Sequence, residues 1–187
     1  MAQFIKKANI ILFSACLLYA CNNVEIDEIV FFSAIGGIFP LNNFEDPDDP
    51  KVILPGSFVW VEASELGENS DLLLDTFNLS QQEIETAIPE TVDLALLTED
   101  ANWRFLRTVQ LFLYNETGDD SLLIARLDSV ATNEDSVISL NANNESIRNF
   151  IFQEQFRLKA QLELRDTLNE SYLFEAVGIN RLKGSIK

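Results

Sequence analysis

The sequence predicts an all-β fold, an antiparallel β-sandwich with an immunoglobulin-like layout and one or two short helices. Three observations carry this prediction. Seven or eight strand-like segments follow one another at intervals of about ten residues, a spacing typical of sandwiches rather than of parallel sheets. Residues 156–164 alternate apolar and polar side chains strictly, as a strand with one buried face does. Turns rich in Asn, Asp and Gly separate the segments.

The first predicted strand is the apolar run 29–39, which Gly36 and Gly37 would allow to fold as a hairpin. Residues 42–50 hold two prolines and four carboxylates, a composition that excludes helix and central strand and predicts an exposed loop. Residues 57–63 follow a Pro-Gly turn and are rich in aromatic and β-branched side chains. We therefore expect a buried strand there.

One helix is expected before Pro89. Ser80 and Glu83 have the spacing of a capping box, in which each side chain satisfies a backbone group at the start of a helix. Ile84 and Ile88 then recur at helical spacing. A second, shorter helix is expected over residues 145–152, with Asn144 as its cap.

The second half of the chain is dominated by predicted strands. They cover residues 91–97, 105–115, 121–128, 136–141, 156–164 and 171–179. The second and third of these form a hairpin through the turn at 116–120, because Gly118 and its acidic neighbours are turn formers.

The composition excludes several kinds of catalytic site. The chain of 187 residues contains no histidine and two cysteines, so it has no Ser-His-Asp triad and no histidine-ligated metal. Paired carboxylates or a Ser-Lys dyad would still allow catalysis, but none of the lysines lies in a recognisable serine motif. We expect a protein that is not an enzyme, with a carboxylate-based polysaccharide hydrolase as one alternative.

The first 21 residues have the layout of a secretory signal. Lys6 and Lys7 precede an apolar stretch of about a dozen residues, too short for a membrane span of about 20, and small or apolar residues lead to Cys21. Residues 18–21 resemble the lipobox of bacterial lipoproteins. The resemblance implies cleavage before Cys21 and acylation of that cysteine, including an amide-linked chain such as palmitate. Two or more acyl chains anchor a protein stably to a membrane.

This resemblance divides the chain into a signal peptide (1–20), an acidic tether (21–30) and a single domain (31–187). The mature chain then has eleven basic and 30 acidic residues, a formal charge of −19. Such a polyanion repels nucleic acid, so no nucleic-acid partner is expected. With Cys21 acylated and Cys16 removed, the domain has no disulfide and depends on an ordinary hydrophobic core.

The tether resembles the surface-export signals of Bacteroidota lipoproteins, and residues 103–177 are loosely similar to small uncharacterised β-rich lipoproteins of that group. We expect an outer-membrane lipoprotein facing the periplasm or the cell surface. Its expected function is that of a non-catalytic binding or accessory module for an envelope protein or glycan. No cofactor is expected unless calcium binds, which makes a calcium-dependent adhesion domain a second alternative.

Several residues are candidates for particular sites. Calcium takes oxygen ligands from clustered carboxylates, so the loop residues Glu45, Asp46, Asp48 and Asp49 are candidate calcium ligands. Glu116, Asp119 and Asp120 form a weaker candidate by the same reasoning. The hydroxyls of Ser129, Ser136 and Thr167 follow aspartates in triplets that resemble the O-glycosylation acceptor of Bacteroidota.

A basic cluster and the aromatic residues are the remaining candidates. Arg157, Lys159 and Arg165 are expected on the outer face of their strand, where they would pair with acidic neighbours or recognise an anionic glycan. The strand aromatics are expected in the core. Trp103 follows a polar stretch and is the tryptophan expected to stack on a sugar ring, if either does.

Overall fold

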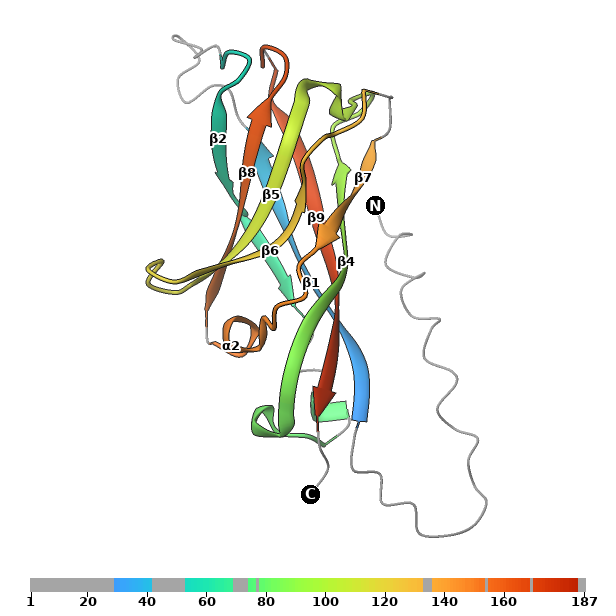
Figure 1. Cartoon of the computed structure of the whole chain (residues 1–187), viewed down its shortest axis with the longest axis vertical. Coiled ribbons are helices and arrows are strands. Elements are labelled where there is room, and N and C mark those ends of the chain that lie inside the picture. Colours follow the sequence, from blue (N-terminus) through green and yellow to red (C-terminus); the bar gives the residue numbers. More distant parts are fainter. Residues whose placement is uncertain are drawn as a thin grey trace, which may run out of the picture.

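The computed structural model of the chain is a sheet of nine antiparallel strands (Figure 1). It describes residues 29–41, 53–68, 74–76, 78–132, 136–153, 155–168 and 170–184. The predicted all-β, antiparallel class is confirmed, since every strand pair in this part of the chain is antiparallel.

The strands are β1 (Ile29–Leu41), β2 (Phe58–Glu62), β3 (Glu65–Glu68), β4 (Ile84–Leu96), β5 (Leu106–Asn115), β6 (Ser121–Leu127), β7 (Val137–Ala142), β8 (Phe156–Leu164) and β9 (Tyr172–Gly184). Their order across the sheet is β2-β8-β5-β6-β7-β4-β9-β1-β3. The helical elements are α2 (Arg148–Ile151) and two 3-10 turns, Gln81–Glu83 and Trp103–Phe105.

The predicted sandwich is not confirmed, because hydrogen bonding runs without a break through all nine strands. β7 pairs with β4 on one side and with β6 on the other, so it joins what would otherwise be two separate sheets. The sheet curls as a half-barrel, and the segment between β2 and β3 brings its edges together. There, the amide of Ala63 donates to Leu158 on β8, and the amide of Ser64 donates to Ile38 on β1.

The core lies inside this curl, where alternate residues of each strand point inward. Phe39 and Phe174 stack with ring centroids 4.8 Å apart, and Trp103 meets Phe174 edge-on at 5.5 Å. The largest fully buried side chains are Trp103, Phe39, Phe174, Leu41, Ile84, Leu94, Leu106, Leu111, Leu113, Ile147, Leu158 and Leu162. The strict alternation predicted for residues 156–164 is confirmed in β8.

The prediction of a helix before Pro89 is wrong. Glu83 accepts hydrogen bonds from the amide and the hydroxyl of Ser80, but the helical turn ends there and β4 begins at Ile84. β4 pairs with β9 over most of its length. Pro89, which has no amide hydrogen to donate, lies beside a register shift in this ladder, where proline is tolerated.

The other predicted elements are found with adjusted bounds. The hairpin of β5 and β6 is confirmed, and its turn contains Gly118 at a φ of +80°. The helix predicted over 145–152 shortens to α2, and Ser146 rather than Asn144 accepts from the first turn, through the amide of Arg148. The run 29–39 is a single strand and not a hairpin, since all of β1 pairs with β9.

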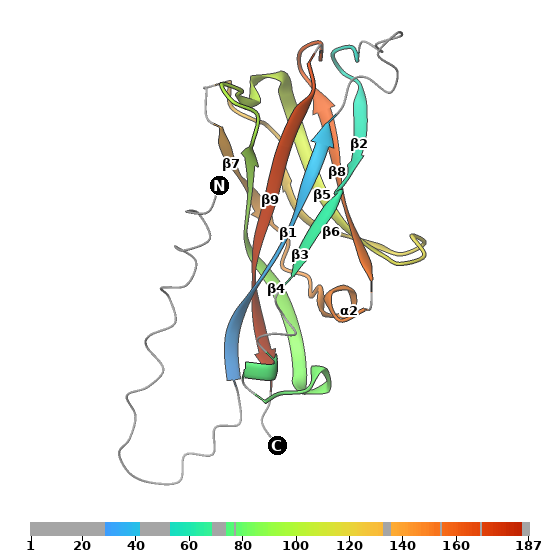
Figure 2. The same ribbon diagram turned by 180° about the vertical axis from the view of Figure 1, so that it is seen from behind.

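The two ends of the sheet hold different elements and connections. β1 begins and β9 finishes at the same end, because Ile29 pairs with Gly184 (Figures 1 and 2). α2 lies toward this end, and its residues Phe150 and Ile151 are buried. The opposite end holds the connections from β4 to β5 and from β6 to β7.

Candidate functional site

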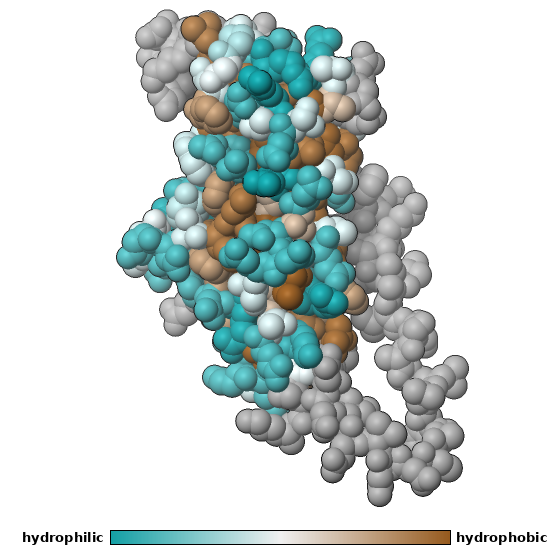
Figure 3. Space-filling model, in the orientation of Figure 1, coloured by the Kyte–Doolittle hydropathy of each residue, from teal (hydrophilic) through white to brown (hydrophobic). Residues whose placement is uncertain are grey.

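The outer faces of β2, β8 and β5 carry a group of aromatic and polar side chains that we call the aromatic platform. Its residues are Phe58, Trp60, Phe112, Tyr114, Glu62, Arg157, Lys159 and Gln161. Phe58 is 62% exposed and Trp60 is 49% exposed, although both are large apolar side chains. Figure 3 views the molecule in the orientation of Figure 1, with β2, β8 and β5 toward the reader, and hydrophilic side chains surround apolar ones on this face.

Strand register places these side chains beside one another. β8 lies between β2 and β5, so that Gln161 lies beside Trp60 on one side and Gln110 on the other. The rings of Trp60 and Phe112 pack across β8 with centroids 5.4 Å apart at 44°. Phe112 and Tyr114 follow at 6.4 Å on the same face of β5. The result is a row of rings that crosses the outer face of β2, β8 and β5 diagonally.

The charged groups of the platform form a compact cluster beside these rings. The carboxylate of Glu62 lies 3.2 Å from Lys159 Nζ and 3.8 Å from Arg157 Nε. The predicted cross-strand pairing of Arg157 and Lys159 with an acidic neighbour is therefore confirmed. Lys159 Nζ also lies 4.9 Å from the centre of the Tyr114 ring, within cation–π range. Arg157 Nε is buried and makes no hydrogen bond within the described part of the chain.

Arg165, the third residue of the predicted basic cluster, does not join this group. Its guanidinium donates to the main-chain carbonyl oxygens of Val130 at 2.6 Å and Arg104 at 3.3 Å. It therefore holds together the connections at the end of the sheet. The expected cluster of three cations reduces to two on the platform.

Trp103 is not exposed, and the expectation that it is the sugar-stacking tryptophan is wrong. Its side chain is 0% exposed, and its indole nitrogen donates to the carbonyl oxygen of Ser136 at 3.0 Å. Its ring packs against Phe105 as well as Phe174. Trp60 is the tryptophan available to a ligand.

The alternation of residues in the sequence indicates that Trp60 is exposed, although the residue types of this segment indicate burial. Residues 57–63 are aromatic and β-branched, and this composition indicated burial. Alternation puts Phe58, Trp60 and Glu62 on one face of the strand and Val59 and Val61 on the other. Because a carboxylate shares its face with Trp60, that face is the one directed to water.

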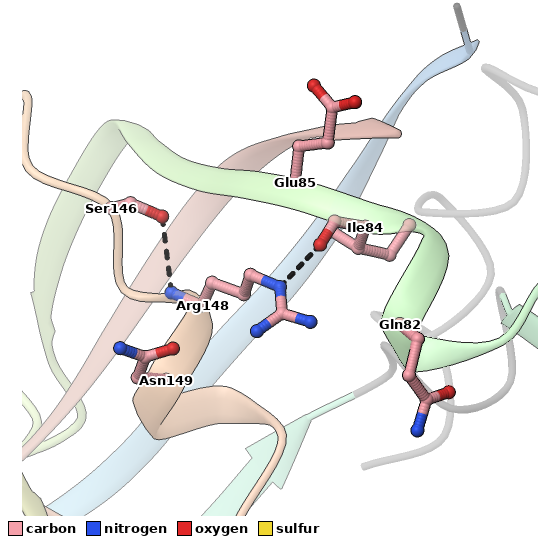
Figure 4. A pocket seen from close by; sticks show the side chains of 6 residues that line it. All are labelled: Gln82, Ile84, Glu85, Ser146, Arg148 and Asn149. Atoms are coloured by element: carbon pink, nitrogen blue, oxygen red, sulfur yellow. Dashed lines mark hydrogen bonds between the residues drawn. The ribbon is translucent and has the colours of Figure 1, made fainter. Parts of the chain in front are cut away.

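A pocket of about 510 Å³ lies between the start of β4 and α2 and is lined by Gln82, Ile84, Glu85, Ser146, Arg148 and Asn149 (Figure 4). The guanidinium of Arg148, the cationic group that lines the pocket, already makes hydrogen bonds to the main chain. It donates through Nε to the carbonyl of Ile84 and through Nη2 to that of Gln81 at 2.9 Å. The hydroxyl of Ser146 accepts from the amide of Ala87 at 3.1 Å. These contacts fasten α2 and the residues before it to the start of β4.

The acidic turn between β5 and β6 is organised by its own hydrogen bonds. Asp119 accepts from the Asn115 side chain at 3.0 Å and from the Thr117 hydroxyl. These bonds, first that of Thr117 and then that of Asn115, lower the pKa of Asp119 below its ordinary value. Within the described ranges, no group of three or more His, Cys, Asp and Glu side chains could hold a metal ion.

Of the other predicted sites, some lie outside the described residues and the rest are exposed. The calcium candidates Glu45, Asp46, Asp48 and Asp49 and the lipidation candidate Cys21 lie outside the described residues. Ser129, Ser136 and Thr167 are all exposed. They lie at the end of the sheet opposite the start of β1, since they follow β6, precede β7 and follow β8.

Among the described residues, no helix has the length and apolar character needed to cross a membrane. No protein-family model matches the chain, and a search of curated proteins finds no significant relative. The case for a function therefore depends on the residues themselves.

Proposed function

We propose that this chain is a non-catalytic, lipid-anchored protein of the bacterial cell envelope, and that its aromatic platform binds a glycan. The exposure of Trp60 beside Phe112, Gln161 and Lys159 is the observation that carries the proposal. A half-exposed indole costs free energy in contact with water, and no feature of the described fold requires one at this position.

The chemistry of the platform suits a sugar. Pyranose rings present C–H faces that stack on flat aromatic rings, and their hydroxyl groups project at the ring edges. Phe58 and Trp60 supply exposed rings. The side-chain amides of Gln161 and Gln110 supply hydrogen-bonding groups for the hydroxyls. A flat wall of this kind accommodates a chain of sugars rather than a small enclosed ligand.

The proposed anchor fits this arrangement. Cys21 precedes the start of β1 by eight residues, a length of about 26 Å when extended. The platform lies on a side wall of the sheet rather than at the end at which β1 begins (Figure 1). A tethered domain can therefore turn this wall toward a polymer in the envelope. Glycosylation at Ser129, Ser136 or Thr167 would lie at the end of the sheet opposite the start of β1.

Native gel electrophoresis with soluble polysaccharides in the gel tests the binding. Glucomannan, xylan and polygalacturonate are suitable probes, because they cover neutral and acidic chains. Retardation by at least one is expected, with loss of retardation in Trp60→Ala. Leu97→Ala is the control, since Leu97 is an apolar side chain 44% exposed after the end of β4, away from the platform. Equal retardation of Trp60→Ala and the parent protein would exclude the platform as the binding site.

Membrane fractionation tests the anchor separately. The parent chain is expected in the membrane fraction, and Cys21→Ser is expected to be released from it. Protease treatment of intact cells then distinguishes a surface position from a periplasmic one. Continued membrane association of Cys21→Ser would refute lipid anchoring without bearing on glycan binding.

A further inference from the structure

The wall opposite the aromatic platform is apolar and exposed. β1 is apolar on its outward face and, apart from the buried Ser33, on its inward face: Phe31, Ile35 and Phe39 point into the core, and the outward positions of the same strand are Val30, Phe32, Ala34, Gly36, Ile38 and Pro40. A strand with one face in water normally alternates apolar and polar residues, whereas a strand apolar on both faces is typical of burial on both. The outward face of β1 therefore has the composition of an interface.

The neighbouring strand β9 extends this surface, which we call the β1–β9 wall. Register places Leu173 beside Pro40, Val177 beside Gly36 and Ile179 beside Ala34. The exposed large apolar residues of the wall are Val30, Phe32, Leu173, Val177 and Ile179. Figure 2 shows β1 and β9 together on the side of the molecule away from the platform.

Two opposite charges border the centre of the wall on β9. Glu175 lies beside Ile38, and Arg181 lies beside Phe32. Each is three residues from Gly178, which pairs with Ile35, and therefore about 10 Å from it along the strand. Arg181 also contacts Glu90 at 3.1 Å, but a guanidinium has five N–H donors and can bind a second carboxylate.

This pattern is complementary to itself. A two-fold axis at the level of Ile35 and Gly178, perpendicular to the strands and parallel to the wall, would lay β9 antiparallel on β9 of a second copy. It would place Glu175 of each copy opposite Arg181 of the other. The same operation places Val177 opposite Ile179, and on β1 it places Phe32 opposite Ile38. Each of these contacts is then apolar on apolar or joins opposite charges. The outermost outward pair on β9, Leu173 opposite Lys183, is mixed.

We propose that the β1–β9 wall is the interface of a two-fold symmetric dimer of this chain. A homodimer interface is isologous, with the same patch contributed by both subunits, as this wall allows. A lipid surface is the competing occupant, but it would leave the carboxylate of Glu175 without a partner against hydrocarbon, which is costly. In the dimer, the two aromatic platforms face away from each other, so two glycan chains could be held at once.

Thiol cross-linking of the membrane-anchored protein tests the interface. Val177→Cys lies next to the proposed axis, and a short bis-maleimide is expected to link two such chains. Val137→Cys is the matched control, because Val137 is 51% exposed on β7, outside the wall. The unsubstituted chain is run in parallel. Cross-linking of that chain would reveal a free thiol at Cys16 or Cys21, which bears on the processing and the anchor and not on the wall. The variants are then compared in a background that carries both Cys16→Ser and Cys21→Ser.

Charge reversal tests the symmetry itself. In the Val177→Cys background, Glu175→Arg and Arg181→Glu are each expected to reduce cross-linking several-fold, and the double reversal is expected to restore it. Failure of the double reversal to restore cross-linking would overturn the two-fold arrangement. Equal cross-linking at positions 177 and 137 would overturn the interface. A fluorophore attached to the Val177→Cys variant tests the competing occupant. If nitroxide lipids quench this fluorophore and the variant does not cross-link, the membrane is the occupant instead.

Discussion

The contrast between the two tryptophans provides the sharpest test of the fold. Trp103 is fully buried, and substituting alanine for a buried tryptophan costs about 3–5 kcal/mol. Trp60 is half exposed and packs mainly on Phe112, so Trp60→Ala should cost roughly 1–2 kcal/mol. With a urea slope of about 2 kcal/mol/M, Trp103→Ala should lower the unfolding midpoint by about 2 M and Trp60→Ala by less than about 1 M.

Urea unfolding followed by far-UV circular dichroism measures both midpoints. Trp103→Phe provides a milder second variant if Trp103→Ala does not fold, since it keeps an aromatic ring and loses the hydrogen bond to Ser136. Because the chain has two tryptophans, each single variant also leaves one fluorescent reporter. Acrylamide should quench Trp60 strongly and Trp103 weakly. Equal midpoints, or stronger quenching of Trp103, would refute the assignment of one ring to the core and the other to the platform.

Three further predictions concern stability and pH. Ser33→Ala should raise the free energy of unfolding by about 1 kcal/mol in thermal melts, because the buried hydroxyl of Ser33 makes no hydrogen bond within the described residues; a loss of stability would reveal a partner. Gly36→Ala should destabilise the pairing of β1 with β9, because a Cβ at this position would lie 2.6 Å from the carbonyl oxygen of Ala176; faster amide exchange in both strands checks this. The pKa of Asp119 is below its ordinary value, so the carboxylate stabilises the turn fully above about pH 4 and this contribution is lost as pH falls through the lowered pKa. Thr117→Val should raise that pKa in a carboxyl-carbon NMR titration, and an unchanged value would contradict the hydrogen bond as its cause.

Much of the strand pattern could be predicted from local sequence, because alternation and turn chemistry act over a few residues. β8 shows this best: the alternation from Phe156 to Leu164 alone assigns its inner and outer faces. The hairpin turn at Gly118 is equally local, since its positive φ favours glycine. The basic pair of the platform, Arg157 and Lys159, was placed on the outer face by the same alternation.

Elements that depend on distant partners could not be predicted in this way. Residues 80–88 carry a capping box and two isoleucines at helical spacing, yet β4 begins at Ile84 because pairing with β9 satisfies its backbone and buries its apolar side chains. Residue type likewise could not separate Trp60 from Trp103. Their environments differ because one lies on the outer face of β2 and the other is enclosed by Phe105 and Phe174.

The sequence by itself determined the all-β class, the positions of most strands and the outward direction of the basic pair. Only the tertiary structure decided that the strands form one curled sheet rather than two layers, and which tryptophan meets solvent. It also placed the apolar wall opposite the aromatic platform. The physical reason is that each of these features depends on which strands lie side by side, and antiparallel pairing between residues far apart in the chain leaves only a weak signature in local composition.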